Sequence, residues 1–304
     1  MLQSLLLTER GGEAQTWKAS LALELQGAQS DCSLLGTRLI SAKHRGPLYV
    51  QKPFYPEGRS HAHLYLLHPP GGLVSGDELS VKIGASQGAG ALITTPGAAK
   101  IYRARSDTQL QSQKVNLTIT ERSCLEWFPQ ETIVYNAAIA TMDMQVTLSQ
   151  DSSYIGWDIL CLGLPGAAAL FKKGSVNQCL QLFENCGADS NKLIYRDNID
   201  IQASDLLLSS PCGFNQCTVN ASLVAKFPVE KIPLIDSLLD TLRKRLDELG
   251  AGKQVAVTAM GGICISRYLG ESANDAKRLF IELWKMIRPV MIQREASIPR
   301  IWYT

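Results

Sequence analysis

Apolar and polar residues alternate with a period of two along much of the first 225 residues, and this pattern constrains the fold more than any other feature. Successive side chains of a β-strand point to opposite faces of a sheet, so the alternation predicts strands with one buried face. Clusters of Gly, Asn, Asp or Pro separate the segments, as turns require. No helical pattern alternates with these strands, which argues against Rossmann-like and TIM-type folds. The clearest apolar sets are Trp17, Ala19, Leu21, Leu23 and Leu25; Leu79, Val81 and Ile83; Val115, Leu117 and Ile119; Met142, Met144, Val146 and Leu148; and Val219, Ala221 and Leu223.

Two segments in the last third have helical spacing instead. From Ile232 to Leu249 the apolar residues recur every three or four positions, and Gly250 stands where a helix C-cap belongs. The same spacing returns from Ala276 to Ile287, with Ser272 as a candidate N-cap and Pro289 as the expected end. Between them, residues 254–258 and 263–266 read as strands. The fold class is therefore mainly β with two late α-helices.

Length and charge limit the organisation of the chain and its partners. The 304 residues suffice for a large core, and no linker rich in Pro, Gly or Ser divides them, so we predict a single domain over residues 1–304. With 30 Lys and Arg against 28 Asp and Glu, the formal net charge is +2. Such a balance gives no field strong enough to favour nucleic acid.

The apolar segments are too short for export or for a membrane. The run in residues 1–10 is shorter than a signal-peptide core and is followed by a Glu-Arg pair. The longest apolar stretch, residues 159–171, is interrupted by Gly163, Pro165 and Gly166. We therefore expect a cytoplasmic protein with no membrane segment, in which the eight cysteines are reduced.

Two carboxylates stand inside apolar runs. Glu126 lies in a Cys-Leu-Glu-Trp-Phe stretch, and Asp158 lies in a Gly-Trp-Asp-Ile-Leu stretch. A buried carboxylate without a partner costs several kcal/mol, so we expect each of the two either to be exposed to solvent or to have a function. Taken alone, the pattern favours exposure on the wet face of an antiparallel sheet.

Two histidines on one strand face suggest a metal site, but only weakly. His61 and His63 are two positions apart, so both imidazoles point to the same side and could bind Ni²⁺, Zn²⁺ or Cu²⁺. No third ligand is visible nearby, which favours two solvent-facing strand residues. The sequence also lacks an HExxH pair and a GxGxxG loop, so it shows no positive sign of an enzyme.

The stretch from His68 to Ser80, HPPGGLVSGDELS, is a pair of turns rather than a phosphate loop. Its prolines and glycines favour chain reversal, and no GK[ST] follows them. Asp77 is its main chemical group, and the turns could shape a docking edge or the mouth of a channel.

Five motifs occur in register along the chain, at residues 68–77, 94–103, 125–132, 156–163 and 298–304. Read together, they resemble the urease accessory protein UreD (UreH) family. The resemblance implies a fold of strands in a β-helix-like stack with two α-helices in the C-terminal third. It also implies a non-catalytic factor that binds UreF, and through UreF the GTPase UreG, and that docks on urease apoprotein to help insert nickel. No cofactor is expected to be tightly bound, and Ni²⁺ is expected to pass transiently through an internal polar tunnel.

The resemblance also suggests roles for individual residues. A conduit needs weak, successive oxygen ligands, because several Cys or His ligands would hold Ni²⁺ too tightly. We therefore expect Asp77, Glu126, Glu131 and Asp158 to line the nickel path, and Lys100, Tyr102 and Arg103 to contact a partner. The two helices are a second candidate surface for UreF, although an apolar helix stripe is more often core.

Two other classes of function remain open. One is a metal-dependent hydrolase with a site near His61, His63 and Asp77, and the other is a β-rich scaffold unrelated to nickel.

Overall fold

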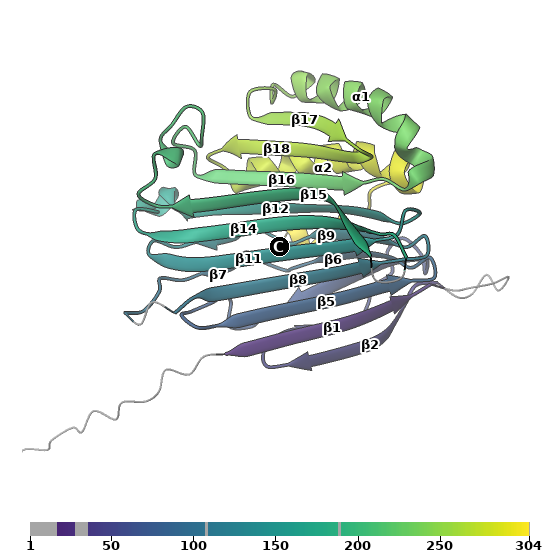
Figure 1. Ribbon diagram of the computed structural model, residues 1–304, viewed down its shortest axis with the longest axis horizontal. Helices are drawn as coiled ribbons and strands as arrows, with labels where there is room; N and C mark the ends of the chain where they lie inside the picture. Colours follow the sequence, from purple (N-terminus) through teal and green to yellow (C-terminus); the bar gives the residue numbers. More distant parts are fainter. Residues whose placement is uncertain (1–16, 28–35, 107–108, 188–189, 304) are drawn as a thin grey trace, which may run out of the picture.

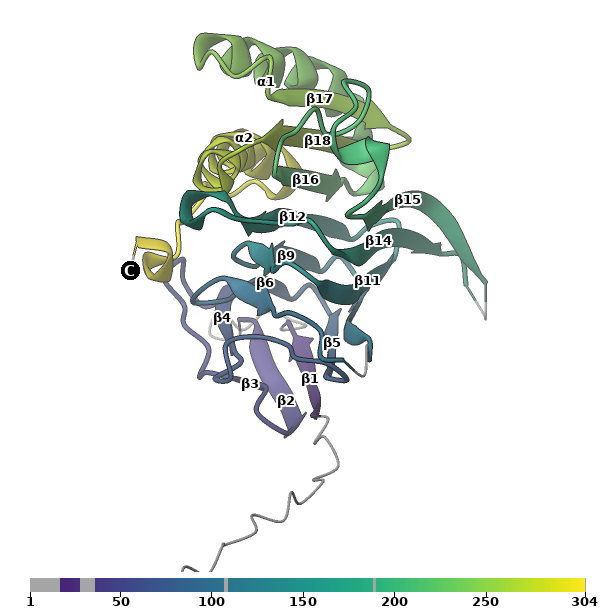
Figure 2. The same ribbon diagram turned by 90° about the vertical axis from the view of Figure 1, so that its left-hand side faces the viewer.

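Two β-sheets face each other, and two helices cover the outer face of one of them (Figures 1 and 2). This arrangement is seen in a computed structural model that describes residues 17–27, 36–106, 109–187 and 190–303. The predicted class, mainly β with two helices in the C-terminal third, is confirmed.

The first sheet has seven strands in the order β15-β14-β11-β8-β5-β1-β2. Its central strands, β1, β5, β8, β11 and β14, run parallel, whereas β2 and β15 pair antiparallel at the two edges. The strands are β1 (Lys18–Gln26), β2 (Arg38–Arg45), β5 (Glu78–Ser86), β8 (Gln111–Ile119), β11 (Ala138–Leu148), β14 (Gly174–Asn185) and β15 (Asn191–Gln202).

The second sheet has eleven strands and a main path of β17-β18-β16-β12-β9-β6-β4-β3. Its strands are β3 (Tyr49–Val50), β4 (His61–Leu67), β6 (Gly90–Thr94), β7 (Ala99–Ile101), β9 (Cys124–Phe128), β10 (Thr132–Val134), β12 (Ser153–Leu164), β13 (Ala169–Leu170), β16 (Val219–Lys226), β17 (Val255–Met260) and β18 (Ile263–Gly270). Short 3₁₀-helices lie at Pro165–Ala167, Leu206–Leu208, Val229–Leu234 and Arg300–Tyr303.

The chain winds between the two sheets in successive coils, which produces the expected β-helix-like stack. From β4 to β14 it passes repeatedly from the eleven-stranded sheet to the seven-stranded sheet and back. Each new strand lies parallel to the equivalent strand of the coil before it, so His61, Gly90, Cys124 and Ser153 fall in register on neighbouring strands. The three sequence distances between these positions are 29, 34 and 29 residues, so the coils do not repeat with one fixed period.

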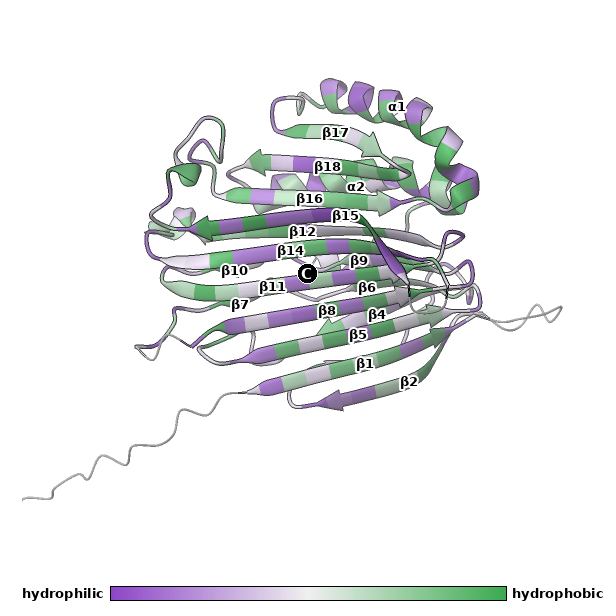
Figure 3. Cartoon of the chain, viewed as in Figure 1, coloured by the Kyte–Doolittle hydropathy of each residue, from purple (hydrophilic) through white to green (hydrophobic). Residues whose placement is uncertain are grey.

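The period-two pattern correctly identifies the inward faces of the strands. Leu23, Ile83, Leu117 and Val146 are buried between the sheets, and bands of opposite hydropathy alternate along β5, β8 and β11 (Figure 3). Trp17 is the exception. It precedes β1 and its side chain is 49% exposed.

Helix α1 (Ile235–Glu248) and helix α2 (Ala273–Ile292) close a separate apolar core on the outer face of the eleven-stranded sheet. The Ser272 side chain caps α2 by accepting from Asp275 N, and Gly250 follows α1 with a positive φ of 67°, as predicted. The predicted start at Ile232 is wrong, because Pro233 keeps that segment in a 3₁₀ turn. The predicted end at Pro289 is also wrong. A proline removes only one helical bond, and buried Met291 holds the last turn in place.

Several expectations concern the rest of the chain. The seven described cysteines are all free, as predicted, whereas Cys32 lies outside the described residues. Residues 1–10, in which we find no export signal, also lie outside them. In the described ranges, neither helix combines the length and the apolar composition that crossing a membrane requires.

Candidate functional site

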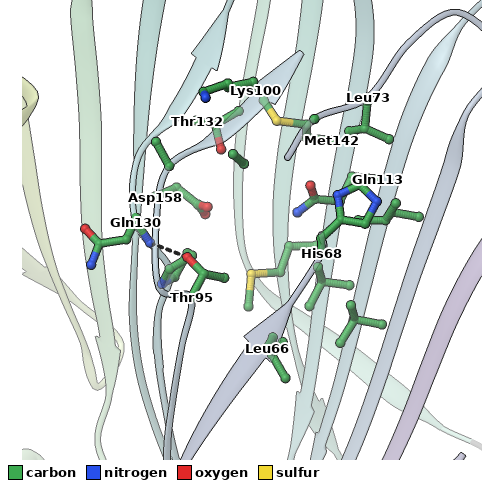
Figure 4. A pocket seen from close by; sticks show the side chains of 18 of the residues that line it. Leu66, His68, Leu73, Thr95, Lys100, Gln113, Gln130, Thr132, Met142 and Asp158 are labelled. Carbon is green, nitrogen blue, oxygen red and sulfur yellow. Dashed lines mark hydrogen bonds between the residues drawn. The ribbon is translucent and has the colours of Figure 1, made fainter. Parts of the chain in front are cut away.

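A cavity of about 260 Å³ lies between the two sheets, where the two apolar clusters of the inter-sheet core meet (Figure 4). Its seven-stranded wall is largely apolar and includes Val115, Met142 and Met144. The opposite wall carries more polar groups. These are Thr95, Gln130, Thr132 and Asp158, and Gln113 and Gln178 add amides from the first wall.

Asp158 is the chemically distinctive residue of this cavity. It belongs to β12 and points into the cavity from the eleven-stranded sheet (Figure 4). Its carboxylate has no hydrogen-bond or ion-pair partner among the described residues. Burial raises the pKa of Asp158 to about 7, and the charge of Asp197 contributes to the rise. Near neutral pH this carboxylate therefore exchanges protons readily and is available to a cation.

The mouth of the cavity is formed by the turn after β4 and by the segment between β6 and β7. His68, Gly71 and Gly72 line it on one side, and residues 95–100 line it on the other. Burial lowers the pKa of His68, against an opposing effect of the Asp77 charge. Its imidazole is therefore neutral at pH 7 and can offer a lone pair. Nothing in the sequence singles out His68 as a ligand, because a single histidine before a turn carries no spacing signal.

Gly72 explains the glycine-rich turn at this mouth. A Cβ at position 72 would lie 2.5 Å from Cε2 of Tyr102 and 2.6 Å from the Lys100 carbonyl oxygen. The turn and β7 are joined by hydrogen bonds from Leu73 N to Lys100 O and from Tyr102 N to Leu73 O. Only glycine permits this close approach, so the residue holds the turn against the edge of the cavity.

Replacing Gly72 with alanine is expected to lower the free energy of unfolding by about 1–3 kcal/mol, the usual cost of forcing extra volume into a packed site. Gly97→Ala is the matched control. It lies at the same mouth, but its Cβ would meet nothing within 4 Å. Urea unfolding of both variants measures the difference, and equal effects would contradict the assigned role of Gly72.

Asp77 holds the same turn in shape rather than lining the cavity. It is buried, and its carboxylate accepts hydrogen bonds from Val74 N at 2.9 Å and from Trp17 N at 3.0 Å. The side chain therefore joins the turn to the start of β1.

Glu126 is fully buried, so the exposure favoured by the sequence pattern is wrong. Strand β9 lies between β6 and β12 and is parallel to both, and this residue turns toward α2. Trp284 Nε1 donates to Glu126 Oε1 at 2.8 Å, and Arg288 Nε donates to the same oxygen at 3.0 Å. Burial would raise the pKa of Glu126, but the hydrogen bond and charge of His61 and the charge of Arg288 outweigh it and keep the pKa below its usual value.

The two histidines of β4 are also buried, which corrects the expectation that they face solvent. His61 Nε2 lies 2.9 Å from Glu126 Oε2, and His63 Nε2 lies 2.7 Å from Glu57 Oε1. Arg288 also pairs with Glu57 at 2.7 Å, so one arginine joins both carboxylates. We call these five residues, Glu57, His61, His63, Glu126 and Arg288, the buried charge cluster.

The residues proposed for a hydrolase site do not form one. His61 and His63 have separate carboxylate partners, and Asp77 is bound to backbone amides elsewhere. Over the ranges that the structure describes, no group of three or more His, Cys, Asp or Glu side chains is arranged to hold a metal ion.

Glu57 gives the buried charge cluster a pH dependence. Burial would raise the pKa of Glu57, but hydrogen bonds with His63 and Arg288 outweigh it and lower the pKa to about 2. In the unfolded chain, the pKa of Glu57 lies near its ordinary value of 4.5. The ionised Glu57 carboxylate therefore stabilises the folded chain fully above pH 4.5, and this stabilisation is lost as pH falls toward about 2. We expect the urea concentration at the unfolding midpoint to decrease when the pH is lowered from 6 to 3. The decrease should be smaller in Glu57→Gln. An equal fall in both proteins would exclude Glu57 as the cause.

The remaining predicted residues surround the mouth of the cavity. Lys100 lines it, the Tyr102 ring packs against Tyr135 at 5.2 Å, and Arg103 is exposed. Glu131 lies in the strand-joining segment beside it, where its carbonyl oxygen accepts from Ala99 N at 2.9 Å. Of the four predicted path carboxylates, only Asp158 lines the cavity. Their roles in nickel transfer and partner contact stay predictions.

Comparison with known proteins identifies similar chains along almost the whole length. The family model described as UreD urease accessory protein matches residues 18–303. A chain from Psychromonas ingrahamii, named urease accessory protein UreD, is 41% identical over 300 residues, which cover 95% of this chain and 94% of that protein. Proteins of the same name from Marinomonas sp. and Dechloromonas aromatica are 37% and 42% identical, and the matches cover 100% and 88% of this chain and 95% and 90% of theirs.

Proposed function

The chain belongs to the UreD urease accessory protein family, and on this premise we propose that it is a non-catalytic factor through which nickel reaches urease apoprotein. In this proposal it works in the cytoplasm together with UreF and the GTPase UreG. Ni²⁺ is the cargo and is held only in passing. The observation that carries the proposal is the unpaired carboxylate of Asp158 inside a cavity between two sheets.

The chemistry of the cavity suits brief residence of a divalent cation. Asp158 supplies one carboxylate, and the neutral imidazole of His68 supplies one nitrogen near the mouth. The side chains of Thr95, Thr132, Gln113, Gln130 and Gln178 add hydroxyls and amides, which are weak ligands for Ni²⁺. A transfer path must bind the ion strongly enough for entry and weakly enough for release, and this ligand set meets both conditions.

The mouth also provides a place where a partner could deliver or receive the ion. Lys100 lies on its rim, and Tyr102 and Arg103 follow directly along the chain. We propose that these three residues contact a partner, which would then sit over the opening. Because the turn containing Gly72 is hydrogen-bonded to this segment, the rim and the cavity keep a constant spacing.

The proposal is tested by activating urease apoprotein with nickel in the presence of UreF and UreG, with and without this chain. We expect active, nickel-containing urease only when the chain is present, together with its retention in pull-downs with UreF. Full nickel content without the chain, or turnover of a metabolite by the chain alone, would overturn the proposal.

A further inference from the structure

An ion pair between Arg267 and Asp197 joins the two sheets at one edge, where two rows of residues that begin in the cavity end. Val81, Val115, Met144, Leu180 and Asp197 are neighbours in register across the seven-stranded sheet and share its inward face. The first three line the cavity. Asp197 ends this row on the edge strand β15, with its side chain 13% exposed.

A matching row crosses the eleven-stranded sheet. Asp158 on β12 pairs in register with Ser222 on β16, and Ser222 pairs with Arg267 on β18. All three therefore lie on the face that carries Asp158 into the cavity. Both rows start in the cavity and end at the same edge, where Figure 2 shows β15 beside β16.

The ends of the two rows are tied together. Arg267 Nη2 lies 3.1 Å from Asp197 Oδ1. Tyr195 supports the pair, because its hydroxyl donates to Asp197 Oδ2 at 3.3 Å and accepts from Arg267 Nη2 at 3.5 Å. The Arg267 side chain is 56% exposed, so it can leave Asp197 for solvent without unpacking the core.

We infer that Arg267 gates the side of the cavity next to Asp158, admitting or releasing a divalent cation only when its guanidinium leaves Asp197. This inference rests on the proposed function, since it assigns one end of the nickel path. The charges explain why a divalent ion can replace Arg267 beside Asp197. Arg267 neutralises one carboxylate and leaves Asp158 without a counterion, whereas a divalent ion between the two aspartates balances both. In its resting position, Arg267 repels cations from the row that leads to Asp158.

The test measures whether Arg267 excludes cations from this row in the full-length chain. A thiol is introduced by Ser222→Cys, between Asp158 and Arg267, and its modification by a cationic and by a neutral methanethiosulfonate reagent is followed by mass spectrometry of the peptide containing position 222. The exposed native cysteines are resolved as separate peptides. In Arg267→Gln we expect the cationic reagent to react about tenfold faster, the size of effect produced by one nearby, partly screened charge. The neutral reagent should react at an unchanged rate.

Two controls separate the gate from a general loosening of the edge. Arg267→Lys keeps the charge and should react like the parent. Arg278→Gln removes an arginine of similar exposure, 55%, that pairs with Asp275 on α2, and should have no effect. An unchanged cationic rate in Arg267→Gln, or equal acceleration of both reagents, would overturn the gate. This outcome does not depend on urease, so it is distinct from a failure of nickel transfer, which the Asp158 variants test.

Discussion

Replacing Arg288 with methionine is expected to lower the free energy of unfolding by about 3–5 kcal/mol, because it leaves two buried carboxylates without their shared cation. Arg288 is fully buried and pairs with both Glu57 and Glu126. It also donates to the backbone oxygen of Glu295, which fixes the chain after α2. Apart from Arg288, only the two histidines of β4 form ion pairs with these carboxylates among the described residues. The measurement is urea unfolding at pH 7.

A matched variant shows whether the loss of stability comes from leaving buried charges unpaired or simply from removing an arginine of α2. Arg278 lies on the same helix, is 55% exposed and pairs with Asp275 at the surface. Arg278→Met should cost no more than about 1 kcal/mol, the usual limit for exposed pairs. Adding Glu126→Gln to Arg288→Met should restore part of the loss, because one uncompensated charge is removed. If both arginine variants lost the same stability, the buried charge cluster would not be the element that joins α2 to β4 and β9.

Replacing Asp158 with asparagine is expected to reduce the initial rate at which urease apoprotein acquires nickel by about tenfold. The change keeps the shape of the side chain and removes its negative charge. Losing one carboxylate contact with a divalent ion readily accounts for the 1.4 kcal/mol or so that a factor of ten represents. Nickel bound per urease active site, measured by elemental analysis over time, reports the effect separately from catalysis.

The pKa of Asp158 adds a second signature to this variant. Since the pKa is raised to about 7, the fraction of charged carboxylate grows as pH rises from 6 to 8. Nickel transfer through the parent chain should rise over this range, and transfer through Asp158→Asn should not follow the same curve. Asp158→Glu retains a carboxylate and Asp236→Asn changes an exposed residue of α1, so both should transfer nickel near the parent rate. A normal rate in Asp158→Asn would exclude this residue from the path.

Local patterns predicted the elements well, because they depend on near neighbours in the sequence. The alternation around Leu23 and Leu117 identified both strands and their buried faces, and Ser272 and Gly250 marked helix ends correctly. The errors at Ile232 and Pro289 also have local causes, namely a proline that delays α1 and a buried methionine that prolongs α2.

The site was predicted only in part, because carboxylates in apolar runs look alike in sequence. Glu126 and Asp158 are both flanked by large apolar residues. The fold turns one toward Arg288 on α2 and the other into the cavity between the sheets. Arg288 lies 162 positions from Glu126, so no spacing rule could have joined them. His61 lies 65 positions from Glu126, so this pair was hidden in the same way, whereas Glu57 lies only 6 positions from His63.

The sequence by itself determined that this protein is built from half-buried strands with two late amphipathic helices, and its motifs identified the family. These properties follow from side-chain periodicity, caps and turns, which act over a few residues. Only the tertiary structure decided which carboxylate is neutralised and which stays free. That outcome depends on which strands become neighbours, and coils of unequal length bring together residues that are far apart in the chain. A charge is stabilised or left available by what packs against it, and the packing is a property of the whole fold.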